Sequence, residues 1–322
     1  MSILITGGTG FIGVGLARKL VERGKEVVLF DIAPQTERLA DLKDKVKVIR
    51  GDLQVWPEVL NAVKDNKVED IFHLGAMLSV PSEHNPWGSF QTNVAGTTYV
   101  LEAARLFGVK KVIFPSSVVT YGLDAGEVIT DVTLQRPVTM YGVGKLYGEL
   151  VGRFYRRKFD LDFRCLRYSA VCGPGVKTPG VAQYNPWMIE NAALGKPYEC
   201  FVSKDTAGPV IYFKDAIHAT LMLYDAPREK IKTVTYNISE LSPAPTAREL
   251  ELTIKKFIPE AKVTYKPDPV VMEYYRSQSI KIIDDTRARQ EWGWKPLYSS
   301  LEEIVADFIQ EVRTRPKYYG LA

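Results

Sequence analysis

Short apolar runs and longer amphipathic stretches alternate through the first half of the chain. The runs are rich in Val, Ile, Leu and Phe and are too short for helices, so they predict buried strands. The stretches between them carry apolar residues three and four positions apart, which predicts helices with one buried face. We expect strands at residues 2–6, 26–30, 46–50, 71–74, 111–114 and 163–168, and helices at residues 11–23, 87–107 and 140–159.

This alternation predicts an α/β fold, a doubly wound parallel sheet with helices on both faces. After about residue 170 the pattern loosens, and Gly and Pro gather between residues 172 and 186. We expect residues 1–170 to form the sheet domain and residues 171–322 to form mainly a smaller C-terminal lobe. No change in composition marks a linker, so the boundary is soft and some later segments are expected to return to the core.

The charge and hydropathy of the chain narrow the possible partners. Lys and Arg number 42 against 38 acidic residues among 322, and the net charge of +4 is spread along the chain. A nucleic-acid-binding protein usually concentrates its basic residues in a stripe. No apolar run approaches the ~18 residues of a membrane helix. We therefore expect no nucleic-acid or membrane partner. A strand-like segment directly at the start leaves no room for a leader, which predicts a cytoplasmic protein.

Cysteine and histidine usage argues against a metal site. The chain has three cysteines, Cys165, Cys172 and Cys200, and none pairs as CxxC. Its three histidines also lack zinc-ligand spacing. An odd number of cysteines without metal spacing favours free thiols in a reducing compartment, and we expect no bound metal.

A glycine-rich segment, TGGTGFIG, lies between the first expected strand and the first expected helix. Gly7, Gly10 and Gly13 permit a tight turn and let the backbone approach a pyrophosphate, which then meets the unpaired N–H groups of the helix. The spacing is GxxGxxG rather than GxGxxG, so the letters alone are a weak match. The strand-turn-helix context makes a dinucleotide site the stronger interpretation, and a glycine-rich helix cap is the alternative.

The end of the second expected strand indicates which dinucleotide binds. Asp31 stands there, where its carboxylate can accept hydrogen bonds from ribose hydroxyls and would repel a 2′-phosphate, so NAD is favoured over NADP. Arg38 could reach a phosphate, which leaves NADP open. Asp52 follows the third expected strand and either faces the adenine or caps the next helix.

Tyr141 and Lys145 stand four residues apart on one expected helix, which puts them on the same face. An ammonium near a phenol favours the phenolate, so we expect a lowered pKa for Tyr141 and a general base for an alcohol. Ser117 follows the fifth expected strand, and ligands bind at the carboxyl ends of such strands. Its hydroxyl could hold the substrate oxygen, with turn chemistry as the alternative role.

Taken in order, TGGTGFIG, Asp31, GDL, HLGA, Asn93, SSVVTYG and YGVGK resemble the extended short-chain dehydrogenase/reductase family over essentially the whole chain. The resemblance implies a Rossmann domain with a smaller C-terminal substrate-binding lobe. It also implies a homodimer built on the two long helices, and catalysis by Ser117, Tyr141 and Lys145. The residues it implies for binding NAD are Gly7, Gly10, Phe11, Ile12, Gly13, Asp31, Asp52, Leu53, His73, Gly75, Ala76, Asn93, Tyr141, Lys145 and Tyr168.

Two branches of this family compete. Nucleotide-sugar epimerases carry an Arg that pairs with the substrate pyrophosphate, and Gly208 takes its place here. Stretches such as RPVTMYGVGK, KPYEC and EWGWKP look like the short-chain L-threonine 3-dehydrogenases instead. That branch binds its amino acid with paired threonines, where this chain has Val181 and Ala182, so a less polar or larger alcohol is also open. The residues expected to contact substrate are Ser79, Ser117, Tyr141, Val181 and Tyr184.

The resulting expectation is NAD-dependent oxidation of a secondary alcohol. L-Threonine or a related small β-hydroxy compound is the best guess for the substrate. The first alternative is a nucleotide-sugar 4-epimerase or dehydratase that retains its NAD. The second is a non-catalytic NAD sensor, which would need no proton-transfer residues.

Overall fold

A computed structural model describes residues 2–321 and contains a seven-stranded parallel sheet in that range. The strand order is β3-β2-β1-β4-β5-β7-β11, so the chain builds outward from β1 in one direction and then, from β4 onward, in the other. This order confirms the doubly wound α/β fold. The strands are β1 (Ser2–Thr6), β2 (Glu26–Asp31), β3 (Val46–Arg50), β4 (Val68–His73), β5 (Lys111–Ser117), β7 (Asp162–Tyr168) and β11 (Thr235–Asn237).

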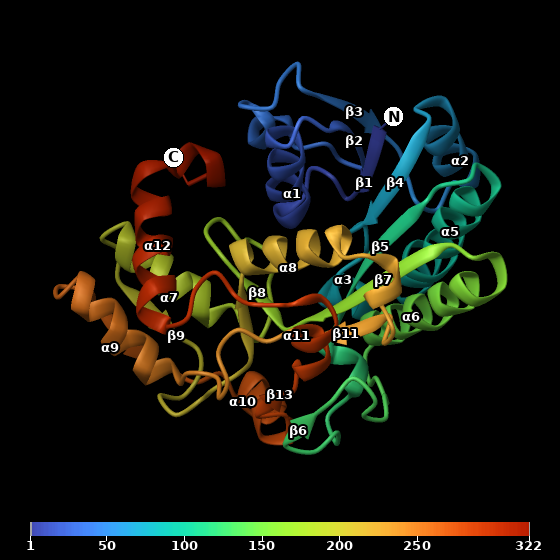
Figure 1. Ribbon diagram of the computed structural model, residues 1–322. Coiled ribbons are helices and arrows are strands. Elements are labelled where there is room, and N and C mark those ends of the chain that lie inside the picture. The colour runs from blue at the N-terminus through green and yellow to red at the C-terminus, as the bar shows by residue number, and fades with distance from the viewer. Residues whose placement is uncertain (1, 322) are drawn as a thin grey trace.

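Helices cover both faces of the sheet, as buried parallel strands require (Figure 1). On one face lie α1 (Phe11–Glu22) and α8 (Phe213–Asp225), which contact each other. On the other face lie α2 (Trp56–Asp65), α5 (Gly96–Leu106) and α6 (Met140–Phe159). None of the helices in residues 2–321 has the length and apolarity needed to cross a bilayer.

The helix expected at residues 87–107 is interrupted. It is divided into α4 (Pro86–Ser89), a π-helical turn η2 (Phe90–Ala95) and α5. Asn93 explains the wide turn, because its side-chain amide bonds both the N–H and the carbonyl of Met77, at 2.8 and 2.9 Å. Such π turns are common at functional sites. Periodicity alone does not predict this interruption.

The C-terminal lobe is built from short strand pairs and helices, grouped at the left and bottom of Figure 1. Its strands join segments far apart in the chain, and each pair is parallel. The pairs are β8 (Ala170–Cys172) with β10 (Val210–Tyr212), β9 (Tyr198–Cys200) with β12 (Val263–Tyr265), and β6 (Val128–Ile129) with β13 (Ile282–Ile283). The helices are α7 (Tyr184–Ala193), α9 (Ala247–Phe257), α10 (Pro269–Ser277), α11 (Thr286–Trp292) and α12 (Leu301–Thr314).

Later segments return to the sheet. β11 pairs with β7 at the sheet edge, and α8 packs across one face. The last helical turn, η5 (Pro316–Tyr319), lies against the N-terminal half, where the guanidinium of Arg18 stands 3.1 Å from the ring centroid of Tyr318. One apolar cluster runs from this face of the sheet into α7, α9 and α12. A boundary at residue 170 stays a prediction, because the two parts share this core.

Candidate active site

The topological switch point of the sheet lies between β1 and β4, which are neighbours from which the chain builds outward in opposite directions. In such sheets ligands usually bind at this point, in the crevice outside the carboxyl ends of the strands. The two loops that follow these strands touch each other. Gly7 has φ +61°, and a Cβ there would stand 2.9 Å from the Cα of Gly75. Thr6 fixes the second loop, because its hydroxyl accepts a hydrogen bond from the N–H of Gly75 at 3.0 Å.

The glycine-rich turn leaves the start of α1 open. A Cβ on Gly13 would collide with the carbonyl oxygen of Gly7 and would stand 2.8 Å from that of Gly8. No side chain within residues 2–321 caps α1, and its first turn holds no acidic residue. The N–H groups at this end therefore face outward with the positive end of the helix dipole. A pyrophosphate fits this cradle, with Gly10, Phe11 and Ile12 at its edge.

Asp31 ends β2 beside this turn. Its Oδ2 accepts hydrogen bonds from the N–H and hydroxyl of Thr9, at 3.1 and 2.7 Å, and its Oδ1 accepts one from Ala33 N–H at 3.2 Å. The carboxylate is thus held in one orientation, with acceptor capacity left for ribose hydroxyls. Thr9 was not singled out from the sequence, although a hydroxyl inside the glycine-rich segment was the available signal.

Asp52 and Leu53 follow β3. The carboxylate of Asp52 accepts a hydrogen bond from the N–H of Gln54 at 2.9 Å, so it orders its own turn. α2 begins at Trp56 and has no side-chain cap among the described residues, so the cap expected from Asp52 does not form. Leu53 is buried, and its side chain fills the space against Gly75. Contact of either residue with NAD stays a prediction.

His73 ends β4 and is fully enclosed. Its Nδ1 lies 2.7 Å from the hydroxyl of Thr6 and its Nε2 lies 3.0 Å from that of Thr97. Burial, with a smaller contribution from Lys145, lowers the pKa of His73 to about 3. The ring is therefore neutral and braces β1 against α5. Gly75 and Ala76 lie in the loop that follows β4, and their contact with NAD stays a prediction.

Ser117, Tyr141 and Lys145 come from neighbouring elements. Ser117 ends β5, and its Oγ accepts a hydrogen bond from Val119 N–H at 3.4 Å. Tyr141 and Lys145 lie in the first two turns of α6, which Thr139 caps through Gly142 N–H. Lys145 Nζ donates to the carbonyl of Pro115 at 2.7 Å and stands 5.6 Å from the ring centroid of Tyr141. This carbonyl anchors Lys145 beside Ser117.

The pKa expectation for Tyr141 is wrong in this structure. Burial raises the pKa of Tyr141 above its usual value rather than lowering it. The same cause lowers the pKa of Lys145 to about 8, although Cys165 and Glu149 oppose it. Removal from water penalises the charged forms of both groups, and it is the largest cause of both shifts. A phenolate at Tyr141 thus needs positive charge beyond that of Lys145.

Two candidate residues point into the core. The hydroxyl of Tyr168 bonds Thr220 and the carbonyl of Ala216 on α8. Tyr184 is fully buried, and its hydroxyl donates to the carbonyl of Thr206 at 3.4 Å. Their roles at the nicotinamide and the substrate stay predictions, with the hydroxyls already engaged. Ser79 opens the short helix α3 (Ser79–His84) just after the crevice loop.

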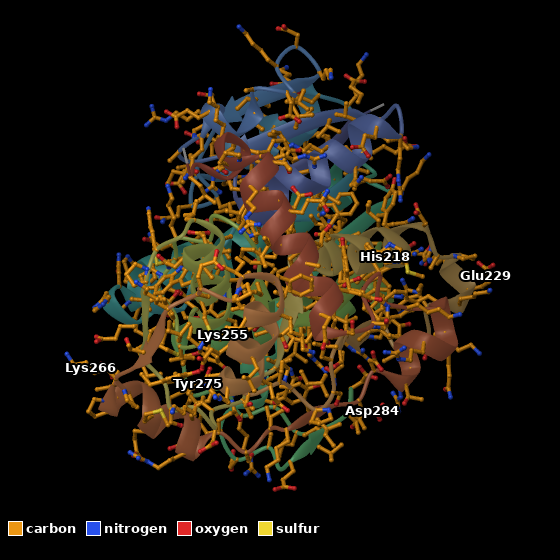
Figure 2. All side chains as sticks on the ribbon, turned by 90° about the vertical axis from the view of Figure 1, so that its left-hand side faces the viewer. His218, Glu229, Lys255, Lys266, Tyr275 and Asp284 are labelled. Atoms are coloured by element: carbon orange, nitrogen blue, oxygen red, sulfur yellow. The ribbon has the colours of Figure 1, made fainter. Side chains whose placement is uncertain are left out.

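Tyr275 of α10, visible in Figure 2, is a residue that the sequence did not indicate. Its hydroxyl donates to the carbonyl of Val181 at 3.2 Å. Its ring covers Gly208, where a Cβ would stand 3.0 Å from Cε1 and 3.1 Å from the hydroxyl oxygen. Gly208 adjoins β10, and Pro209 accepts a bond from Ala170 N–H just beyond Tyr168. Tyr275 thus occupies the space into which a side chain at position 208 would extend.

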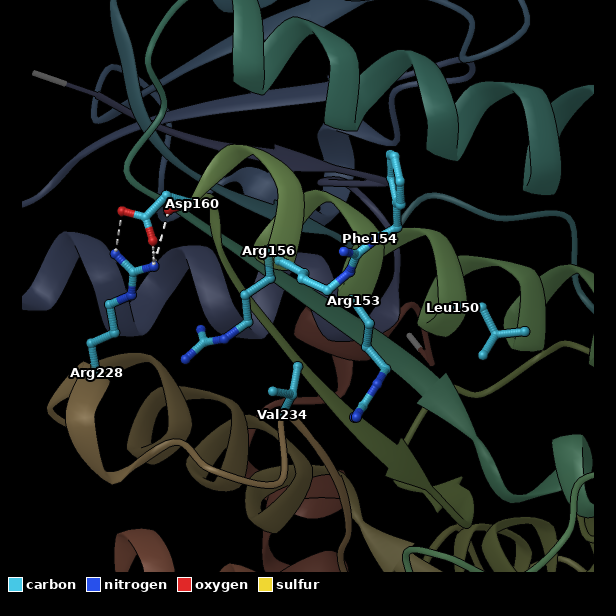
Figure 3. Close-up of a pocket in the computed structure, with 8 residues that line it drawn as sticks. Leu150, Arg153, Phe154, Arg156, Asp160, Arg228 and Val234 are labelled. Carbon is cyan, nitrogen blue, oxygen red and sulfur yellow. Dashed lines mark hydrogen bonds and ion pairs between the residues drawn. The ribbon is translucent and has the colours of Figure 1, made fainter.

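A shallow recess of about 630 Å³ lies elsewhere, at the C-terminal end of α6 (Figure 3). Three of its arginines make hydrogen bonds or ion pairs within the fold. Arg228 pairs with Asp160, Arg153 donates to the carbonyl of Thr233, and Arg156 bonds Asp162. It contains none of the residues expected to bind NAD or substrate.

Residues 3–239 match the family described as "NAD dependent epimerase/dehydratase family". The chain belongs to this family. The chain is also similar to the L-threonine 3-dehydrogenase, mitochondrial, of Bos taurus, with 36% identity over 314 residues, covering 95% of this chain and 81% of the relative. The recognition of an extended short-chain dehydrogenase/reductase is thereby confirmed, and the protein is an NAD-dependent enzyme of that type.

Solved structures of similar proteins superimpose on this chain over nearly its full length. A GalE-like L-threonine dehydrogenase from Cupriavidus necator, in its holo form, has a TM-score of 0.88 and 30% identity, covering 97% of this chain and 100% of that chain. A UDP-glucose 4-epimerase from Thermotoga maritima with UDP-glucose has a TM-score of 0.84 and 26% identity, covering 98% and 99%. The chain is therefore similar to solved structures from both of the branches that the sequence left in competition.

Proposed function

We propose that this family member oxidises a small secondary alcohol with NAD, and that its substrate is L-threonine or a close β-hydroxy relative. One observation carries the proposal. Ser117, Tyr141 and Lys145 end or begin neighbouring elements, and Lys145 is anchored to the strand that carries Ser117. The similarity to L-threonine 3-dehydrogenases over 95% of the chain supports the substrate.

The cofactor cradle fits NAD. The open N-terminus of α1, Gly7, Gly13 and Asp31 would hold the pyrophosphate and ribose, and Lys145 would donate to the second ribose. Asn93 would hold the segment after His73 in place through its two hydrogen bonds with Met77. Bound NAD supplies a hydride acceptor and a positive charge at its nicotinamide ring.

Residues of the chain itself accept the hydroxyl proton of the alcohol. The hydroxyl of Ser117 holds the substrate oxygen, and Tyr141 Oη takes the proton from it. Lys145 contributes positive charge that favours the phenolate of Tyr141. The alcohol loses this proton and a hydride from the carbinol carbon, which leaves a ketone. From L-threonine the product is 2-amino-3-oxobutanoate. Ser79 and Val181, together with Tyr184 from within the core, are proposed to shape the substrate pocket.

The first experiment measures NADH formation with L-threonine, other β-hydroxy compounds and simple secondary alcohols at saturating NAD. We expect efficient turnover of L-threonine. Turnover of other β-hydroxy compounds alone would keep the oxidation and reject threonine. Tight NAD binding with no turnover of any alcohol would contradict the proposal and favour an NAD sensor.

A nucleotide-sugar epimerase is the second candidate, favoured by the 26% identity to the UDP-glucose enzyme over almost the whole chain. Against it, Tyr275 fills the space beside Gly208. A pyrophosphate is bound best by bidentate arginine, and Gly208 offers no charge. The two functions differ in whether reducing equivalents leave the enzyme. An epimerase would retain NAD on purification and turn over nucleotide sugars with no net NADH.

We also propose a homodimer in a reducing, cytoplasmic compartment. Trp87, Phe90 and three residues on one face of α6, Val143, Leu150 and Phe154, are exposed although large and apolar. A second copy of the chain would cover them. Light scattering should give twice the 36.2 kDa of one chain. A single-chain mass that persists at high concentration would contradict the dimer.

A further inference from the structure

Glu149 is a buried carboxylate on the helix that carries Tyr141 and Lys145. It lies one turn beyond Lys145 and is 2% exposed. Its Oε1 accepts a hydrogen bond from the hydroxyl of Ser116, the neighbour of Ser117 on β5. Its Oε2 accepts one from Gln135 Nε2 at 3.1 Å. A glutamate within a long helix normally faces water, so this position needs an explanation.

Arg167 is the partner that makes this burial tolerable. It is the last residue but one of β7, next to Tyr168, and its Nη2 lies 2.7 Å from Glu149 Oε2, with Nε 3.0 Å from Oε1. Its remaining donor reaches the hydroxyl of Tyr121 and the carbonyl of Asp131. Arg167 is 3% exposed, and every nitrogen of its guanidinium has an acceptor. The pair therefore satisfies the donors and acceptors that burial would otherwise leave unpaired.

Together these bonds join the segments that carry the catalytic candidates. Ser116 belongs to the end of β5, Tyr121 to the turn η3 (Val118–Tyr121) that follows Ser117, and Glu149 to α6. Lys145 adds a parallel connection to Pro115. A shift of α6 along β5 would break the contacts that Glu149 makes with Ser116 and Arg167.

We propose that Glu149 and Arg167 are positioning residues that fix α6 against the ends of β5 and β7. As an ion pair they also keep the net buried charge near Tyr141 and Lys145 at zero. The inference rests on the proposed function, because it assigns these two residues to the alcohol-oxidising site.

The electrostatic part of the proposal follows from the titratable and charged groups that lie near the Glu149–Arg167 pair. Lys145 on α6, Cys165 on β7, Tyr121 in η3 and Asp131 in the following loop all interact with it. Beyond them, His73 faces Lys145, while Arg287 and Asp284 face Asp131. Glu149 itself helps Lys145 to keep its proton. Without Glu149, the buried charge of Arg167 would stand uncompensated on the same side of the site.

The test uses Glu149→Gln and the double variant Glu149→Gln/Arg167→Gln, each saturated with NAD. Eight helical residues place Tyr141 about 12 Å from position 149, where one charge moves an ionisation by about one pH unit at an effective dielectric of ~20. In the single variant the unpaired charge of Arg167 favours the phenolate of Tyr141. The acid limb of the pH–rate profile should therefore move to lower pH by that amount. In the double variant it should return to the wild-type position, with kcat lower on the order of tenfold from lost positioning.

Two further variants keep the test valid if Glu149→Gln does not fold. Gln135→Lys adds a positive charge beside Glu149 at a half-exposed position. It should move the acid limb of the pH–rate profile to lower pH by a smaller amount. Arg157→Gln removes a positive charge from the exposed end of α6 and should leave the limb unchanged.

The readout does not depend on the substrate. The ultraviolet phenolate signal of the NAD complex, taken as a difference from Tyr141→Phe, reports the same ionisation when no alcohol is turned over. A failed threonine assay therefore leaves this measurement intact. The proposal is overturned if the ionisation of Tyr141 occurs at the wild-type pH in Gln135→Lys or Glu149→Gln. It is also overturned if the ionisation in the double variant shifts as far as in Glu149→Gln.

Discussion

The dinucleotide crevice and the C-terminal lobe position their ligand-facing groups by different means. In the crevice, close backbone packing and small side chains do so, with Gly7 against Gly75 and Gly13 against Gly7. In the lobe, side chains from distant segments do so, with Tyr275 bonded to Val181 and covering Gly208. The crevice therefore tolerates almost no added atom, whereas the lobe can change its lining residue by residue. This difference suits a fixed cofactor and a variable substrate.

The largest effect is expected at Tyr141, the proposed proton acceptor. Replacing it with Phe removes the only atom of that side chain that can take a proton. Catalysis by a positioned base is worth about 10²–10⁴-fold, so kcat should fall by roughly 10³-fold with little change in NAD affinity. Steady-state kinetics and NAD titration measure the two quantities. Near-normal turnover would remove Tyr141 from the mechanism.

Alanine at two glycines compares the two regions directly. In Gly13→Ala the new Cβ meets backbone oxygens that cannot move aside, so NAD binding should weaken by about 10- to 100-fold. In Gly180→Ala the nearest atom is the Gln183 side chain at 3.6 Å, so NAD binding should stay unchanged. Fluorescence titration with NAD measures both. Equal losses would show that the crevice is no more tightly packed than the lobe.

His73 tests whether the crevice also depends on an uncharged core. Its pKa of about 3 lies below the ordinary value of 6.5, so below pH 6.5 the unfolded chain binds a proton that the folded chain excludes. The stability this provides is present above pH 6.5 and is lost as the pH falls toward 3. The loss between pH 7 and pH 5 should be about 2 kcal/mol.

Urea unfolding at the two pH values measures this loss. In His73→Asn, which keeps a polar side chain without that proton, the fall should be smaller by the same amount. A fall of equal size in the variant would assign the pH dependence to other groups.

The smallest effect is expected from Tyr275→Phe. It deletes the hydrogen bond to the Val181 carbonyl and keeps the ring over Gly208. One neutral hydrogen bond is worth about 1 kcal/mol, so KM for the alcohol should rise about fivefold while the Kd for NAD does not change. A change in NAD affinity instead would place Tyr275 with the crevice rather than the lobe.

The sequence predicts the strands and helices around the crevice well because their determinants are local. The glycine turn, Asp31 and the Tyr141–Lys145 spacing each lie within one strand-turn-helix unit, and the structure forms those units near the expected positions. It predicts the lobe poorly because β9 pairs with β12 and β6 pairs with β13 across long separations. Strands of two or three residues carry too little periodicity to be recognised.

Glu149 and Tyr275 show the same limit at single residues. A glutamate at a helical position predicts a solvated face, and only the buried Arg167 opposite it reverses that interpretation. Tyr275 acquires its role from Gly208, 67 positions earlier in the sequence. The pKa of Tyr141 was predicted in the wrong direction because spacing on a helix says nothing about burial.

The contact between η5 and α1 has a consequence for synthesis on the ribosome. Tyr318, whose ring covers the guanidinium of Arg18, is synthesised 300 residues after it. The edge strand β11 and the helices that complete the shared apolar cluster also follow residue 170. A nascent chain must therefore carry an unfinished apolar surface for most of its translation. Such surfaces are what chaperones bind, so this fold should depend on them more during translation than a self-contained first half would.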